Sequence, residues 1–296
     1  MARSDDPQTR LLSVDFEDWH QLVRRRIGVD GWEQPGPALR RQTERLLSLL
    51  DALEVRATFF VLGMAARCHP ELIERIAAAG HEIGCHGDAH QLVNTQTPNE
   101  FAEDLHAART TIERLSGRRP IGYRAPAFSI TRETPWAYDV LVDEGFAYDA
   151  SQHDTPRVRD RVVESTAGPH RMQLRDGALW EFPVAVWRTR RTRLPVGGAS
   201  YWAMVPTAAV LKGVAEAGAL AGLYLHPYEL DTEPLRAALP ASATPAQRAQ
   251  GLLRGAQRNL ARLRATEVLE AIAERHRLIP YGEAYAQLSG STPASS

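Results

Sequence analysis

Short apolar segments alternate along the chain with longer segments of helical period. Six of the short segments have the length and the β-branched or aromatic content of buried strands: 11–16, 57–63, 81–86, 121–126, 146–151 and 221–226. Between them, apolar residues recur at helical spacing over 38–53, 70–79, 98–115, 131–144 and 207–217. This alternation predicts a parallel sheet, and about seven such units predict a closed α/β barrel.

The remaining segments are less regular. Residues 178–187 form one long apolar strand or a strand pair, 244–275 are helical, and 278–281 form a last short strand. The polar segment 152–177 predicts a loop. Because no linker separates two domains, we expect a single domain over residues 1–296, with frayed tails at about 1–8 and 289–296.

Composition restricts the classes of function. The 296 residues are 44% apolar and 24% charged, with a formal net charge of −1, which is typical of a soluble globular protein and argues against nucleic acid as a partner. We find no apolar run of signal-peptide or membrane-span length, and only Cys68 and Cys85 could form a disulfide. These features predict a cytoplasmic protein. The arginine-rich segment 188–193 is either a solvated loop or a cradle for an anionic group.

Polar residues follow most of the predicted strands, at the ends that face the active site in a parallel barrel. A single aspartate there is usually a helix cap and a single histidine is usually structural, so the signal is their convergence on one rim. The residues are Asp15, Glu17, Asp18, His86, His90, Arg124, Asp149 and His226.

The strongest local signal is HGDAH (86–90). Two imidazoles four residues apart can bind one metal ion, and a carboxylate from the acidic first strand completes a set of two histidines and one carboxylate. Such a set leaves coordination positions for water and substrate. Zn²⁺ is the expected ion, and Co²⁺ and Ni²⁺ also suit these ligands.

Three longer motifs carry a resemblance to a known family: RATFFVLG (56–63), GHEIGCHGDAH (80–90) and GYRAPAFS (122–129). Over about residues 11–226 the chain resembles the polysaccharide deacetylases, carbohydrate esterase family 4. Segments 194–202 and 254–263 resemble the branch found at bacterial exosortase and exopolysaccharide loci. The resemblance implies a distorted (β/α)7 barrel. It also implies a metal-dependent hydrolase of non-peptide carbon–nitrogen bonds that removes N-acetyl groups from a glycan or exopolysaccharide precursor.

The resemblance implies catalytic roles at matching positions. Asp15 would be the general base that deprotonates the attacking water, and Arg124 would orient its carboxylate and keep it ionised. His226 in LYLH (223–226) would be the general acid that protonates the leaving amine. The carboxylate that orients His226 is not evident from the sequence, and the candidates are Asp149 and then Asp231.

The metal ligands would be His86, His90 and one carboxylate. Strand alternation puts Asp15 and Glu17 on one face and Asp18 at the turn, so we prefer Asp18 as the ligand, with Glu17 as the alternative or as a residue that faces the substrate.

The substrate wall is expected to differ from the family pattern, because Ala127 stands where an aromatic residue is usual and Phe128 follows it. The backbone N–H near Ala127 would stabilise the oxyanion, and Leu225 would line the acetyl pocket. Two other functions remain open. One is an amidohydrolase of a small metabolite on the same barrel, and the other is a catalytically silent glycan-binding subunit.

Overall fold

The computed structural model describes residues 8–154 and 168–290. Its main element is a nine-stranded sheet with the order β10-β1-β2-β3-β4-β5-β7-β6, in which β11 also pairs with β1. The strands are β1 (Thr9–Phe16), β2 (Thr58–Val61), β3 (Glu82–Cys85), β4 (Gly122–Tyr123), β5 (Tyr148–Asp149), β6 (His170–Leu174), β7 (Gly177–Glu181), β10 (Gly222–Leu225) and β11 (Arg277–Ile279).

The strands from β10 through β7 pair in parallel, as the alternating pattern predicts. After β7 the chain returns to the other edge of the sheet, because Val184 forms a parallel bridge with Gly222 of β10. The sheet thereby curls into the predicted barrel, and the carboxyl ends of its strands meet at one rim. Strand β6 is antiparallel to β7 and lies outside this parallel set.

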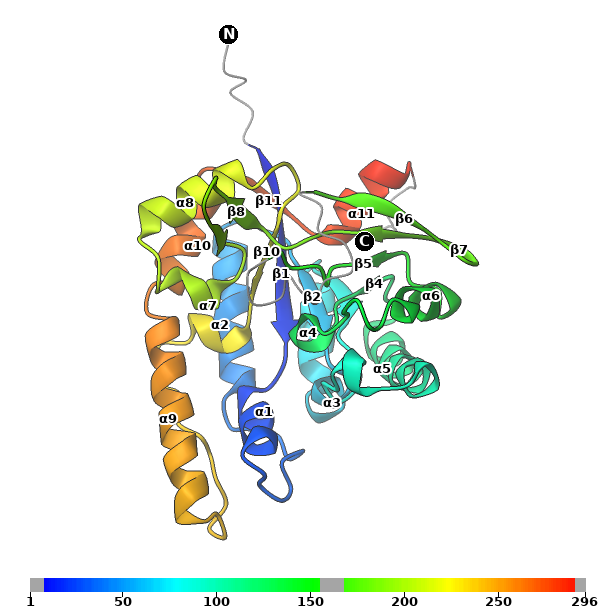
Figure 1. Ribbon diagram of the computed structural model, residues 1–296. Coiled ribbons are helices and arrows are strands. Elements are labelled where there is room, and N and C mark those ends of the chain that lie inside the picture. The colour runs from blue at the N-terminus through cyan, green and yellow to red at the C-terminus, as the bar shows by residue number, and fades with distance from the viewer. Residues whose placement is uncertain (1–7, 155–167, 291–296) are drawn as a thin grey trace.

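Helices surround the sheet (Figure 1). They are α1 (Trp19–Arg26), α2 (Leu39–Ala52), α3 (Gly63–Cys68), α4 (Pro70–Ala78), α5 (Pro98–Ser116), α6 (Trp136–Asp143), α7 (Ala199–Trp202), α8 (Thr207–Glu216), α9 (Pro245–Ala261), α10 (Ala265–Ala273) and α11 (Tyr281–Ser289). Three short 3₁₀ segments are η1 (Val93–Thr95), η2 (Pro126–Phe128) and η3 (Pro227–Leu230), and a separate hairpin joins β8 (Val186–Arg188) to β9 (Arg193–Pro195).

Local signals in the sequence account for several of these boundaries. Helix α5 begins at Pro98 after a capping box, in which Thr97 accepts from the backbone of Glu100 and the Glu100 side chain accepts from the backbone of Thr97. It ends at Ser116 and is capped by Gly117, whose φ of 70° lies in the left-handed region that favours glycine. The central strand β1 is buried along nearly all its length, which explains its apolar Leu11, Leu12, Val14 and Phe16.

The less regular segments agree with their predictions in part, and for 178–187 the structure has two strands, the second of the two alternatives. The predicted helix 244–275 is two helices, α9 and α10. Segment 178–187 is divided into β7 and β8, since Pro183 provides no backbone donor for a continuous strand. The predicted loop 152–177 contains β6, while its part 155–167, like tail residues 1–7 and 291–296, lies outside the described residues.

The arginine-rich segment 188–193 is the turn of the β8–β9 hairpin. The arginines at its two ends, Arg188 and Arg193, both form ion pairs with the buried carboxylate of Asp154. These two guanidinium groups therefore hold the hairpin against the barrel. In the part of the chain that the structure describes, no helix is long and apolar enough to cross a membrane.

Candidate active site and metal centre

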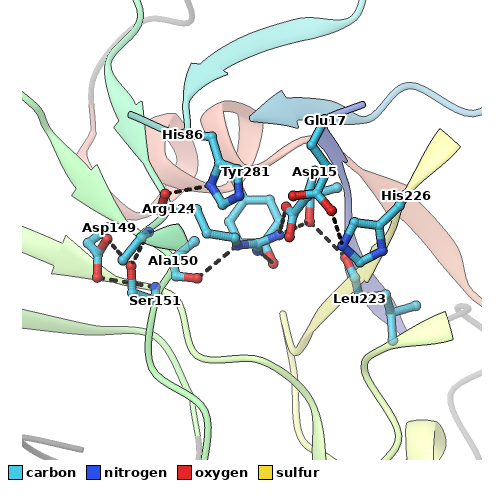
Figure 2. A network of polar contacts seen from close by, with 12 residues as sticks. Asp15, Glu17, His86, Arg124, Asp149, Ala150, Ser151, Leu223, His226 and Tyr281 are labelled. Carbon is cyan, nitrogen blue, oxygen red and sulfur yellow. Dashed lines mark hydrogen bonds and ion pairs between the residues drawn. The ribbon is translucent and has the colours of Figure 1, made fainter. Parts of the chain in front are cut away.

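An open cavity of about 1220 Å³ lies at the carboxyl ends of the parallel strands. Its lining brings together Asp15, Glu17, His86, His90 and His226, which are far apart in the sequence. Asp15 lies in β1 and Glu17 just after it, His86 and His90 follow β3, and His226 follows β10. Figure 2 shows Asp15, Glu17, His86 and His226 arranged around one centre. Most of the charged groups of the site thus belong to the polar residues that follow the predicted strands.

Glu17, His86 and His90 form a cluster that could hold a metal ion. Their ligand atoms lie within 4.8 Å of one another, and His90 Nε2 is 3.2 Å from a Glu17 carboxylate oxygen. The Nδ1 atom of His86 is 2.7 Å from the carbonyl oxygen of Arg124, which orients the ring and leaves Nε2 for a metal. His90 has a φ of 53°, a backbone conformation that costs a non-glycine residue energy and is concentrated at functional sites.

The charge states of this cluster also suit a cation. Burial opposes the charge of Glu17, but the neighbouring His226, His90 and His86 outweigh it and lower its pKa to about 2. Burial is the main cause that lowers the pKa of His86 to about 4. Metal ions bind the ionised carboxylate and the neutral imidazole, so the donor set fits a divalent metal in both type and protonation.

The structure does not place Asp18, the preferred carboxylate ligand, with the two histidines. Asp18 is the N-cap of α1: one of its carboxylate oxygens accepts from the backbone N–H of His20 at 2.8 Å, and the other accepts from that of Gly36 at 2.5 Å. This geometry corrects the preference for Asp18, because both oxygens are used by backbone donors. The missed signal was an aspartate directly before the helical segment 19–26.

Asp15 is held by a fully buried guanidinium. Arg124 Nη1 donates to Asp15 at 2.8 Å and to the hydroxyl of Ser13 at 2.6 Å, while Nε donates to the carbonyl of Ala150 at 3.0 Å and Nη2 to the hydroxyl of Tyr281 at 2.9 Å (Figure 2). Burial opposes the charge of Arg124, but Asp15 and Tyr281 outweigh it and raise its pKa. Four acceptors fix the guanidinium, so Arg124 in turn fixes the Asp15 carboxylate.

His226 is oriented by Glu229, a residue that sequence reasoning missed. The Nδ1 atom of His226 is 3.1 Å from a Glu229 oxygen, and its Nε2 is 3.5 Å from Glu17. Burial disfavours the imidazolium form, but Glu229 and Glu17 outweigh it and raise the pKa of His226 to about 9. Ser200 donates a short hydrogen bond to Glu229 and accepts one from Arg258 at 2.8 Å.

The two aspartates expected to orient His226 lie elsewhere. Asp149 accepts hydrogen bonds from the backbone and the hydroxyl of Ser151, at 3.1 and 2.6 Å. Asp231 forms an ion pair with Arg41 at 2.7 Å. The available signals were HPYE (226–229), which forms a local capping box, and the 194–202 and 254–263 segments, which contain Ser200 and Arg258.

The substrate wall differs in part from the prediction. Ala127 and Phe128 line the cavity, and both have a positive φ, of 51° and 55°, a backbone conformation that is concentrated at functional sites. Leu225 is fully buried in the main core and does not line the cavity, whereas Tyr224 does. Alternation along β10 explains this correction, because Tyr224 and His226 share the inward face and Leu225 points away.

Comparisons with known proteins agree with this fold. Residues 30–141 match the polysaccharide deacetylase family, and residues 151–271 match a domain of unknown function (DUF3473). A Mycobacterium smegmatis protein crystallised as a candidate polysaccharide deacetylase has a TM-score of 0.61 at 21% identity, covering 100% of this chain and 96% of that one. The Bc1960 peptidoglycan N-acetylglucosamine deacetylase has a TM-score of 0.51 at 15% identity, covering 97% and 90%.

Curated relatives match over shorter segments. The peptidoglycan deacetylase-like protein FGM2 of Gibberella zeae is 33% identical over 157 residues, which are 48% of this chain and 43% of the relative. The peptidoglycan-N-acetylmuramic acid deacetylase PdaC of Bacillus subtilis is 25% identical over 176 residues, 59% of this chain and 37% of the relative. The match thus spans less than half the length of these relatives. The single-domain organisation stays a prediction.

Proposed function

We propose that this chain is a polysaccharide deacetylase of carbohydrate esterase family 4, a divalent-metal-dependent hydrolase that removes N-acetyl groups from a glycan. One observation carries the proposal. The Glu17/His86/His90 cluster, the Asp15–Arg124 pair and the His226–Glu229 pair all meet in one cavity. Hydrolysis of an acetamide needs such a combination of an electrophilic centre, a base and an acid.

Glu17, His86 and His90 would hold the metal, and Zn²⁺ is the ion we propose, with Co²⁺ and Ni²⁺ as alternatives. When bound, a divalent ion of this kind polarises the acetamide carbonyl and makes water more acidic. Three protein ligands are what catalytic zinc sites supply when they keep a position open for substrate.

The protein's own residues would move the protons. Asp15, fixed by Arg124, takes a proton from the attacking water as its oxygen bonds to the acetyl carbon. His226 gives its proton to the amide nitrogen as the carbon–nitrogen bond breaks, which yields acetate and a free amine. Glu229 keeps the imidazole in the orientation and the charged form that this donation requires. The backbone N–H at Ala127 would donate to the oxyanion.

The cavity favours a glycan over a small metabolite as substrate. Its volume of about 1220 Å³ exceeds the roughly 300–1,000 Å³ that is usual for a small-molecule pocket, and it is open to solvent. An exopolysaccharide precursor in the cytoplasm is the substrate we propose. Two cysteines that are both free are consistent with a reducing compartment.

The test combines metal analysis with acetate release. The purified protein, stripped by chelation and reloaded with Zn²⁺, Co²⁺ or Ni²⁺, is expected to bind one equivalent and to release acetate from N-acetylated oligosaccharides. Asp15→Asn should retain the metal and lose acetate release by at least about 100-fold, whereas His86→Ala should lose both. Wild-type acetate release from Asp15→Asn protein would refute the proposal. A metal-free, inert protein that binds glycan would instead support the silent-subunit alternative.

A further inference from the structure

The rim of the cavity carries four arginines from two helices. Arg25 and Arg26 come from the end of α1, and Arg254 and Arg258 come from α9. The two helices contact each other and project together past the end of β1 (Figure 1). The acidic residues of the lining, by contrast, are Asp15 and Glu17 at the floor. The cavity therefore has a positively charged entrance above the acidic catalytic centre.

Within the described part of the chain, none of these arginines forms a direct ion pair, although Arg258 is connected through Ser200 to Glu229. Arg25 donates to the carbonyl of Ala89 at 2.6 Å, and Arg258 donates to Ser200. Arg26 is exposed and Arg254 is half-buried, and neither forms a hydrogen bond or ion pair with described residues. Arg26 and Arg254 line the cavity without a counter-charge among the described residues, so their guanidinium groups are available for a ligand.

The surroundings reinforce this charge. Residues 234–266 contain six arginines, of which Arg254 and Arg258 line the cavity, and no aspartate or glutamate; of the three arginines that end α1, Arg25 and Arg26 line it, although the whole chain has a net charge of −1. A one-sign surface at the mouth of a cleft attracts ligands of the opposite sign and raises their rate of association. Such a concentration of arginine at the entrance is not expected for a neutral glycan.

We propose that this arginine rim binds an oxyanion of the substrate, so that the glycan deacetylated here carries a carboxylate or a phosphate group. The proposal rests on the proposed function and narrows its substrate class. The planar guanidinium group forms paired hydrogen bonds with either group, which gives orientation as well as attraction. The acetamide would lie at the floor of the cavity and the anionic group at its entrance.

The experiment compares three N-acetylated oligosaccharides of equal length: one neutral, one with a uronate residue and one with a phosphate monoester. For the wild-type, metal-loaded protein, KM for the uronate or the phosphate substrate should be at least about tenfold lower than for the neutral one, and added salt should reduce that ratio. The preferred substrate of the two identifies the anionic group. The double variant Arg26→Gln/Arg254→Gln should bring the ratio close to one.

Arg277→Gln is the matched control, because Arg277 is an exposed arginine paired with Glu283 and does not line the cavity. It should keep the wild-type ratio. Equal KM values for neutral and anionic substrates, or an unchanged ratio in the double variant, would overturn the proposal while acetate release still supported the deacetylase. Calorimetry of the binding of the same oligosaccharides tests the arginine rim independently of the deacetylase reaction. An anion preference that the double variant loses supports the rim even if no acetate is released.

Discussion

Replacing Arg124 by methionine is expected to lower the free energy of unfolding by about 3–5 kcal/mol, the usual cost of removing one partner of a buried ion pair. Methionine fills much of the same volume but carries no charge. Asp15, which is 4% exposed, would then be a buried carboxylate without its counter-ion. Ser13, Ala150 and Tyr281 would each lose a hydrogen bond as well.

The second variant, Asp15→Asn/Arg124→Met, isolates the charge. Asparagine removes the uncompensated carboxylate, so the double variant should be more stable than the sum of the two single changes by about 2 kcal/mol. Urea unfolding followed by tryptophan fluorescence at pH 7 measures these differences. The control is Arg277→Met, whose exposed ion pair should be worth about 0–1 kcal/mol. A loss below about 1 kcal/mol in Arg124→Met, or strict additivity in the double variant, would refute the reasoning.

Four further predictions test single side chains. Glu229→Gln should lower kcat for acetate release by about 100-fold and leave bound metal unchanged, because it only loosens His226. Glu17→Gln should weaken metal binding at least about tenfold by titration. Asp18→Ala should keep the metal but lose about 1 kcal/mol of stability with its helix cap. Burial lowers the pKa of His81 to about 4, whereas the same side chain has a pKa of about 6.5 in the unfolded chain. Protonation therefore favours the unfolded state, so the free energy of unfolding is highest above pH 6.5 and decreases as the pH falls toward 4. Between pH 7 and 5, wild type should lose about 2 kcal/mol more than His81→Asn in urea unfolding, and equal losses would contradict this.

The barrel and the rim could be predicted because both follow from periodicity. The core strands are buried on both faces, so they appear in the sequence as short segments rich in apolar residues, and parallel pairing then fixes which ends meet. That rule needs no knowledge of loops. It predicts that Asp15, His86 and His226 lie close together, although they come from segments up to about 200 residues apart.

The partners of these residues could not be predicted in the same way. Tyr281 reaches Arg124 from helix α11. Ser200 reaches Glu229 from a segment that precedes it, and Arg258 reaches Ser200 from a segment that follows it. Such contacts depend on how loops return to the rim, and sequence period carries no information on this. Asp18 was misassigned for a local reason: the helix that it caps begins immediately after the strand, and three arginines in its eight residues conceal its apolar face.

With Glu17 rather than Asp18 as the candidate carboxylate ligand, the metal ligands are also connected to the proposed general acid. Glu17 lies 3.2 Å from His90 on one side and 3.5 Å from His226 on the other, so one carboxylate links the candidate ligand set to the proposed general acid. An aspartate held by the α1 cap could not make both contacts. Changes at Glu17 should therefore affect metal affinity and proton donation together, whereas changes at Glu229 should affect proton donation alone. That difference distinguishes the two carboxylates in experiments that measure metal content and kcat on the same protein.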